Sequence, residues 1–320
     1  MTTTPNNPII LQLVPLARTQ KSDFPDGYRV ISLWEEDSLD AVIQAHGNDI
    51  VILTTSAVTP TPAALIDRLP NLRAICSNGV GYDSLPVAHA QSKGIQVSNT
   101  PDVLNDCVAD LAWALILATS RRLGQAERFV RDNSWAERKR VPLGNRVAGK
   151  ALGIVGLGRI GMEIAQRATG FRMPIRYHNR NPRSDVQWQY EPSLEALAKW
   201  ADILVIATVG GPSTSKLIDA PIIDALGPDG ILINISRGSV IDEAALVQAL
   251  QDQRLGGAGL DVFENEPHVP DALKQMDNVV VLPHIASATD ETRRAMADLV
   301  MQNVVSFVNT GKLLTPIAPL

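Results

Sequence analysis

Short apolar runs alternate with amphipathic segments over the first hundred residues of the chain. The runs have the length of buried strands, and the segments between them repeat apolar residues at helical spacing. Gly47 and Gly94 stand where such helices would end. The pattern predicts strands at 9–14, 50–53, 72–76 and 95–97, and helices at 38–45, 63–69 and 86–92. A repeat of strand and helix predicts a parallel sheet.

The pattern changes at Pro101, where a long apolar helix is expected over residues 102–123. Val108, Leu111 and Leu115 are among its apolar residues at helical spacing, and Gly124 is placed to end it. Its apolar positions exceed one helix face, so we expect it to be buried between domains or against a second subunit, which favours a homodimer.

Alternation resumes at residue 151, and a last helix is expected over 290–309, with Gly311 after it. That helix lies beyond the second sheet and could return to the first domain. We therefore expect an α/β protein with two doubly wound, parallel-sheet, Rossmann-like domains and a cleft between them. Residues 1–100 and 291–320 would form a substrate-binding domain, and 101–290 a dinucleotide-binding domain. The expected strands of the second are 151–155, 175–177, 203–207, 231–235, 259–262 and 279–282.

Composition narrows the class of protein. The 320 residues suit two domains, and 45% apolar residues with a net charge of −5 are typical of a globular protein without a nucleic-acid partner. The first residues have no positively charged stretch before their short apolar run, and no apolar run of about 18 residues is present, so we expect neither secretion nor a membrane span. Cys76 and Cys107 suit neither a disulfide framework nor a metal site. We expect a cytoplasmic protein without membrane, nucleic-acid or metal partners.

A glycine-rich turn carries the most specific chemistry. It follows a predicted strand and opens a predicted helix, which is the setting of a dinucleotide-binding turn. The first glycine permits a tight turn, the second lets backbone approach a pyrophosphate, and the third lets helix pack on strand. The cofactor-binding residues predicted here are Gly156, Leu157, Gly158, Arg159, Ile160 and Gly161.

The residues after the next strand indicate which dinucleotide is bound. An NAD-binding domain places an acid there for the ribose 2′-hydroxyl, but this chain has Asn179, Arg180 and Arg183. Guanidinium groups bind phosphate oxygens in a fork, so the segment favours the 2′-phosphate of NADP. The alternative is that both arginines are solvated loop charges.

Six segments resemble the D-2-hydroxyacid dehydrogenase family, over nearly the whole chain. Besides the glycine turn they are residues 78–83, 100–104, 234–238, 259–267 and 282–287. The resemblance implies that Arg237 holds the substrate carboxylate and carbonyl, that His284 is the acid/base, and that Glu266 pairs with it. A carboxylate beside an imidazole favours the imidazolium that must donate a proton during reduction.

The same resemblance implies further contacts. Asn78, Gly79, Val80 and Gly81 would bind the substrate, with exposed N–H groups at Val80 and Gly81 facing its carboxylate; an ordinary turn is the alternative. Asp261 would accept a hydrogen bond from the nicotinamide carboxamide, or else cap a strand end. Further cofactor contacts are expected at Thr208, Val209, Gly210 and Ile235.

The residues together predict NADPH-dependent reduction of glyoxylate or hydroxypyruvate to the D-2-hydroxy acid, because residues 177–183 are similar in pattern to glyoxylate/hydroxypyruvate reductases. Glu266 stands where formate dehydrogenases carry Gln, which disfavours that activity. A bulkier 2-oxo acid, such as 2-ketogluconate or an aryl pyruvate, stays open as substrate. A nucleotide-sensing, corepressor-like protein is the rival from another class, and it would bind NADPH with little turnover.

Overall fold

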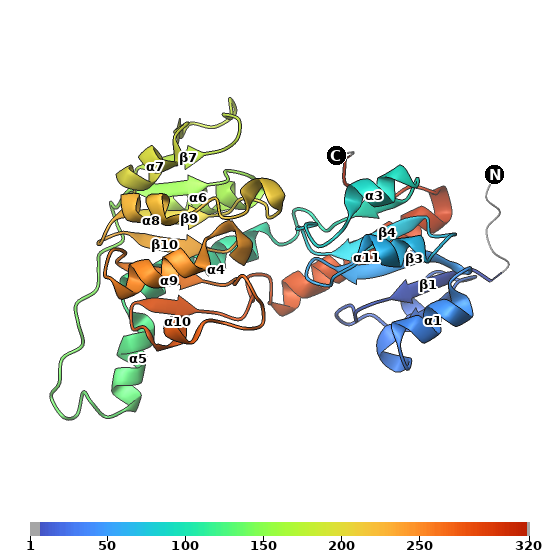
Figure 1. Ribbon diagram of the computed structural model, residues 1–320, viewed down its shortest axis with the longest axis horizontal. Helices are drawn as coiled ribbons and strands as arrows, with labels where there is room; N and C mark the ends of the chain where they lie inside the picture. The colour runs from blue at the N-terminus through green and yellow to red at the C-terminus, as the bar shows by residue number, and fades with distance from the viewer. Residues whose placement is uncertain (1–6, 319–320) are drawn as a thin grey trace. The chain divides into compact units, whose positions relative to one another are not determined.

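The chain folds into two compact α/β units. The computed structural model describes residues 7–318; the chain ends that the predicted first domain includes lie outside the described residues. One unit comprises the chain up to Leu104 and again from Ala288, and the other is Asn105–Ser287. Each unit has its own parallel sheet with helices around it (Figure 1). The prediction of two parallel-sheet α/β domains is confirmed.

The first unit contains a five-stranded parallel sheet in the order β2-β1-β3-β4-β5. β1, β3 and β4 are fully or almost fully buried, which is why their continuous apolar runs are recognisable in sequence. β2 is an edge strand whose polar residues Arg29 and Ser32 hid it from prediction. The strands are β1 Ile9–Gln12, β2 Arg29–Ser32, β3 Ile50–Ser56, β4 Ala74–Asn78 and β5 Gln96–Ser98.

The helix near the end of the chain packs on this first sheet. Thr289 caps its N-terminus and Gly311 ends it in the left-handed conformation, close to the predicted limits. Its residues Ala297, Val300 and Val304 share a core with β1, β3 and β4, so this helix belongs to the core of the first unit. The helices of this unit are α1 Leu39–His46, α2 Ala63–Asp67, α3 Val87–Ser92 and α11 Asp290–Thr310, with the 3-10 turns η1 Lys21–Asp23 and η2 Leu33–Glu35.

The second unit contains a seven-stranded parallel sheet in the order β12-β11-β10-β9-β6-β7-β8. Successive strands run outward from β6 in one direction and from β9 in the other, which makes the β6–β9 pair a topological switch point. Ligands of such sheets bind outside the carboxyl ends of the strands at this point. The strands are β6 Leu152–Val155, β7 Ile175–His178, β8 Gln189–Tyr190, β9 Ile203–Ile206, β10 Ile231–Asn234, β11 Gly257–Leu260 and β12 Val279–Val281.

The apolar helix α4 is buried within its own unit. Its residues pack against β10, β11 and α6, and Trp113 donates a hydrogen bond to the carbonyl of Ile164. Packing within its own unit therefore accounts for the buried residues of this helix, and its burial against a second subunit stays a prediction. The helices here are α4 Asn105–Ser120, α5 Leu123–Arg131, α6 Arg159–Gly170, α7 Leu194–Trp200, α8 Ala220–Leu226, α9 Glu243–Gln251 and α10 Asp271–Gln275, with η3 Pro212–Thr214 and η4 Gly238–Val240.

A second helix, α5, follows α4 where the sequence predicted only the end of one helix. Arg122 adopts the left-handed conformation with φ 54°, and Gly124 lies inside α5 rather than capping α4. No residue of α5 is buried, and α5 together with the chain after it, up to Asn145, forms a long arm that returns to α4 (Figure 1). There the N–H of Asn145 donates to the carbonyl of Ser120 at 2.7 Å.

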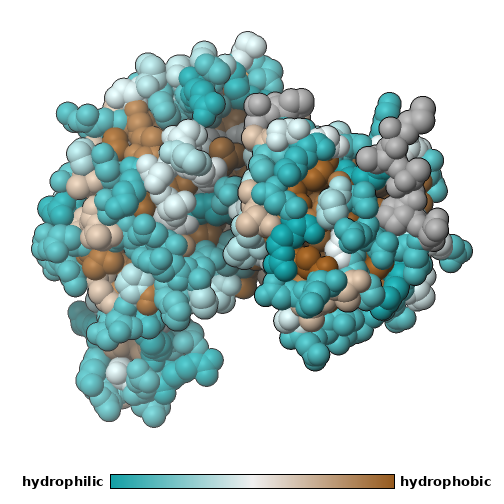
Figure 2. All heavy atoms as spheres, turned by 45° about the vertical axis from the view of Figure 1, so that its right-hand side comes forward, coloured by the Kyte–Doolittle hydropathy of each residue, from teal (hydrophilic) through white to brown (hydrophobic). Residues whose placement is uncertain are grey.

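The surface of the protein is mainly hydrophilic on the face drawn in Figure 2, and its hydrophobic residues form separate small groups. Among residues 7–318, no helix is long and apolar enough to cross a membrane.

Candidate active site

The predicted site residues of the second unit lie at the carboxyl ends of its strands. Gly156 follows β6, Asn179 follows β7, Thr208 follows β9, Asp261 follows β11, and His284 comes shortly after β12. All these strands run parallel, so their carboxyl ends share one edge of the sheet. This edge is where an open parallel sheet binds its ligand.

The glycine turn has the shape that a dinucleotide requires. Gly156 has φ +96°, and a Cβ there would lie 2.5 Å from the N of Thr208. A Cβ on Gly161 would lie 2.3 Å from the carbonyl oxygen of Gly156, so this glycine lets α6 pack on the turn. Of the three glycines in this turn, Gly158 is the one at which an added Cβ would meet open space. These residues fit a pyrophosphate that approaches the backbone at Gly158.

The N-terminus of α6 offers hydrogen-bond donors to that group. Gly158 is the N-cap of this 12-residue helix, and it supplies no side-chain cap. Backbone N–H groups at a helix N-terminus, together with the helix dipole, attract phosphate. Asn179 accepts a hydrogen bond from the N–H of Leu157 at 2.6 Å and so ties the glycine turn to the loop after β7.

The two predicted arginines after β7 differ in their surroundings. Arg180 is exposed and donates to the hydroxyl of Ser213 at 3.4 Å. Arg183 pairs with Asp185, and its Nη1 donates to the carbonyl of Leu157 at 3.0 Å. Sequence reasoning missed Ser213 and Asp185. The sequence places Asp185 two residues after Arg183, which could have suggested an ion pair. The turn that brings the two side chains together could not be predicted from the sequence.

His284 and Glu266 form a hydrogen-bonded pair. The Nδ1 of His284 lies 2.7 Å from Oε2 of Glu266, while Oε1 of Glu266 accepts from the N–H of Phe263 at 3.1 Å. Burial alone would raise the pKa of Glu266, but the His284 contact, the Phe263 N–H and the charge of Arg237 outweigh it and lower that pKa. Glu266 therefore stays ionised beside the imidazole.

The loop that contains Arg237 and the loop that contains Glu266 are in close backbone contact. Arg237 is half-buried after β10, and its Nη1 donates to the carbonyl of Ser236 at 2.9 Å. A Cβ on the next residue, Gly238, would lie 1.9 Å from the carbonyl carbon of Phe263. Only glycine fits there, so the residue type after Arg237 fixes the spacing of the two loops.

Asp261 organises the segment that carries His284. Its fully buried carboxylate accepts from the N–H groups of Ile285 at 2.8 Å and Ala286 at 2.9 Å, and its carbonyl accepts from the N–H of His284. His284 itself is held in the left-handed conformation with φ 54°. Burial raises the pKa of Asp261, although these N–H groups oppose the rise. The contacts within the chain are thus those of a strand-end cap, the alternative that the sequence left open.

The remaining predicted cofactor residues lie at neighbouring strand ends. The carbonyl of Thr208 accepts from the hydroxyl of Ser236 at 2.5 Å, and Val209 is 63% exposed although it is apolar. Gly210 follows Val209, and the N–H of Ile235 donates to the carbonyl of Ile206. Val209 is thus open to a ligand from outside the sheet edge.

The predicted substrate loop of the first unit follows β4, and it has donors to offer. Gly79 has φ +147°, with its N–H on the hydroxyl of Thr100. The carbonyl of Val80 accepts from Asn99. Within residues 7–318, the N–H groups of Val80 and Gly81 have no hydrogen-bond partner. Two adjacent N–H groups of this kind suit a carboxylate.

Comparison with known proteins identifies the family. Residues 113–286, which include the glycine turn, Arg237, Glu266 and His284, match the NAD binding domain of the D-isomer specific 2-hydroxyacid dehydrogenases. The chain belongs to this family. It is an oxidoreductase, as the resemblance of its motifs implied.

Relatives with named activities align with almost the whole chain. A glyoxylate/hydroxypyruvate reductase of Arabidopsis thaliana is 42% identical over 308 residues, covering 96% of this chain and 98% of the relative. A 2-ketogluconate reductase of Gluconobacter oxydans is 40% identical, covering 98% and 99%. The solved NADPH-dependent glyoxylate/hydroxypyruvate reductase of Sinorhizobium meliloti, in complex with NADP and malonate, is 41% identical, with a TM-score of 0.89 over 98% of this chain and 97% of the other.

Proposed function

We propose that this dehydrogenase reduces glyoxylate or hydroxypyruvate to the D-2-hydroxy acid with NADPH. The observation that carries the proposal is the hydrogen-bonded pair of His284 and Glu266, at the same sheet edge as Arg237 and a glycine turn shaped for a dinucleotide. An acid, its orienting carboxylate and a cation for the substrate carboxylate are the groups that reduction of a 2-oxo acid needs.

Each of the three residues has one part in the reaction. His284 binds Glu266 through Nδ1, which directs Nε2 toward the substrate oxygen as proton donor. Glu266 keeps the imidazolium favoured until the proton moves. Arg237 binds the substrate carboxylate in a fork and fixes its orientation. NADPH, when bound, supplies the hydride. The N–H groups of Val80 and Gly81 remain predicted partners of that carboxylate.

The NADPH preference is supported by Arg180 and by the lack of an acid at the end of β7. A solved relative is NADPH-dependent and holds NADP. Loss of a charge-assisted contact to phosphate costs about 1.5 to 3 kcal/mol, or roughly ten- to over a hundred-fold in affinity. Arg180→Ala should raise the dissociation constant of NADPH by that factor in a fluorescence titration and leave that of NADH nearly unchanged. A wild-type enzyme that prefers NADH would contradict the assignment.

The substrate is tested by kcat/KM over a panel of 2-oxo acids with NADPH and NADH. The highest value with glyoxylate or hydroxypyruvate supports the proposal. A higher value with 2-ketogluconate, for which one relative is named, or with an aryl pyruvate would replace the substrate and keep the chemistry. NADPH binding without turnover on any of them would favour the nucleotide-sensing alternative.

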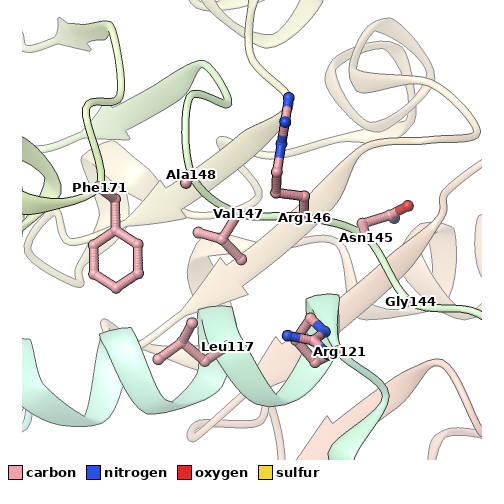
Figure 3. A pocket seen from close by; sticks show the side chains of 8 residues that line it. All are labelled: Leu117, Arg121, Gly144, Asn145, Arg146, Val147, Ala148 and Phe171. Carbon is pink, nitrogen blue, oxygen red and sulfur yellow. The ribbon is translucent and has the colours of Figure 1, made fainter.

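We also propose a homodimer, now on the arm that contains α5 rather than on α4. Large apolar side chains are exposed along it: Leu123 at 51%, Val130 at 55%, Trp135 at 70% and Leu143 at 94%. Beside the end of the arm, Leu117, Val147 and Phe171 contribute apolar side chains to a pocket (Figure 3). A second copy of the arm would cover such surface.

We also propose a cytoplasmic location. Cys76 and Cys107 are free thiols in the structure, which agrees with a reducing compartment.

A further inference from the structure

The carboxylate of Asp185 occupies the guanidinium fork of Arg183. The Nε of Arg183 lies 2.9 Å from Oδ1 of Asp185, and its Nη2 lies 2.5 Å from Oδ2. Two parallel N–H···O bonds of this kind are the strongest geometry available to an arginine. The same fork is the surface that a phosphate would need, so the carboxylate and a 2′-phosphate compete for one side of Arg183.

Two hydrogen bonds to neighbouring residues hold Arg183 in place. The N–H of Arg183 donates to the hydroxyl of Tyr177, a residue of β7 that is 1% exposed, at 2.8 Å. The Nη1 of Arg183 reaches the carbonyl of Leu157 in the glycine turn at 3.0 Å. Arg183 therefore connects the loop after β7 to the turn proposed to bind the pyrophosphate, which places its charge near the adenosine end of the cofactor.

Charge distinguishes the two arginines of this loop. Among the described residues, the partner of the Arg180 side chain is the neutral hydroxyl of Ser213, and no acidic side chain pairs with it. Arg183 has three of its five N–H groups engaged, two of them by a carboxylate that neutralises it. The side chain of Asp185 is 64% exposed, so removing it leaves no buried hole.

We propose that Asp185 is a specificity-determining residue that restrains the affinity of this site for a 2′-phosphate. Its carboxylate withdraws Arg183 from the phosphate and repels the incoming dianion, which leaves Arg180 and Ser213 as the main phosphate contacts. The proposal rests on the proposed use of NADPH. It deepens that proposal, because it names the residue that sets how strongly the enzyme discriminates NADPH from NADH.

The test is the binding of two small probes, adenosine 2′,5′-bisphosphate and AMP, measured by calorimetry on the wild-type chain and on Asp185→Asn. The substitution removes one charge and keeps the side-chain shape. We expect the dissociation constant of the bisphosphate to fall by about two- to fivefold, within the range of an exposed charge interaction, and that of AMP to stay the same. An unchanged or a higher constant for the bisphosphate overturns the proposal, since a higher one means that Asp185 preorganises Arg183 for the phosphate.

A matched control variant and a double-mutant cycle separate this effect from a general change in the net charge of the protein. Asp229→Asn makes the same change in an exposed loop before β10, at the opposite edge of the sheet, and should leave both constants unaltered. In an Arg183→Gln background, Asp185→Asn should gain less than twofold, because the fork it frees is gone. A full gain in that background contradicts the proposal.

Binding of the same probes to Arg180→Ala distinguishes failure of the proposed NADPH site from failure of the proposed role of Asp185. If it weakens the bisphosphate and Asp185→Asn does not strengthen it, the NADPH site stands and the role of Asp185 fails. If Arg180→Ala leaves the bisphosphate no weaker relative to AMP, the proposed NADPH site fails itself, and the role of Asp185 fails with it.

Discussion

The Glu266 carboxylate serves two partners, since Oε2 faces His284 and Oε1 accepts from the N–H of Phe263. Its lowered pKa means that the carboxylate is ionised above that pKa and that its negative charge is lost only as the pH falls through it. An ionised Glu266 beside His284 favours the imidazolium as proton donor, and the reductase rate should fall as the pH rises because reduction consumes a proton.

Glu266→Gln should move the falling limb of the pH–rate profile for reduction to lower pH. The amide keeps the shape but not the charge, so the protonated donor loses the anion that stabilises it. Turnover measured across a pH series in wild type and variant checks this. A falling limb that does not move would mean that Glu266 does not act on His284.

Asp261 should be a positioning residue for His284 as well as a candidate cofactor contact. In Asp261→Asn, one side-chain oxygen remains for two N–H groups, so either Ile285 or Ala286 loses its acceptor. We expect the free energy of unfolding in urea to fall by about 1 to 3 kcal/mol, and kcat to fall with it. Asp229→Asn is the exposed control. A variant with wild-type stability and turnover would contradict this role.

At the scale of elements, the glycine turn makes a prediction that separates folding from binding. Gly158→Ala places its Cβ in open space, so the chain should fold as stably as wild type but bind NADPH more weakly, because the methyl group lies where the pyrophosphate approaches. Gly161→Ala must push against the carbonyl of Gly156, and should lower the free energy of unfolding by about 1 to 3 kcal/mol.

Urea unfolding and NADPH titration of both variants check this contrast. Wild-type NADPH affinity in Gly158→Ala would show that the backbone there does not approach the cofactor.

The same scale shows what the sequence could and could not predict. The buried strands β3, β9 and β10 were recognisable because both faces of a parallel sheet are covered, and each strand therefore contains an uninterrupted run of apolar residues. The edge strand β2 and the helix α5 were missed because neither has that pattern. β2 has only two apolar residues, between Arg29 and Ser32, and α5 buries none of its residues.

Within the candidate site, motifs gave the residue types that lie at strand ends, including Arg237 and His284. They could not give the contacts that depend on turn geometry. Arg183 with Asp185, and Gly238 against Phe263, each result from a backbone path that no periodicity encodes.

For the whole molecule, the exposed arm predicts the assembly state. Light scattering should give twice the chain mass of 34.5 kDa, and Leu143→Glu combined with Val130→Glu should shift the protein toward monomer, because two charges would enter the apolar contact. A mass of 34.5 kDa for the wild type over a wide concentration range would rule the dimer out.

The acid/base role of His284 is the central claim, and one measurement tests it most directly: turnover of glyoxylate by His284→Ala, beside NADPH affinity in the same variant. His268→Ala, in an exposed position of the loop after Glu266, is the matched control. Turnover should fall by roughly 10² to 10⁴ in His284→Ala through loss of general acid catalysis, with NADPH affinity nearly unchanged and the control close to wild type. Near wild-type turnover in His284→Ala would contradict the account.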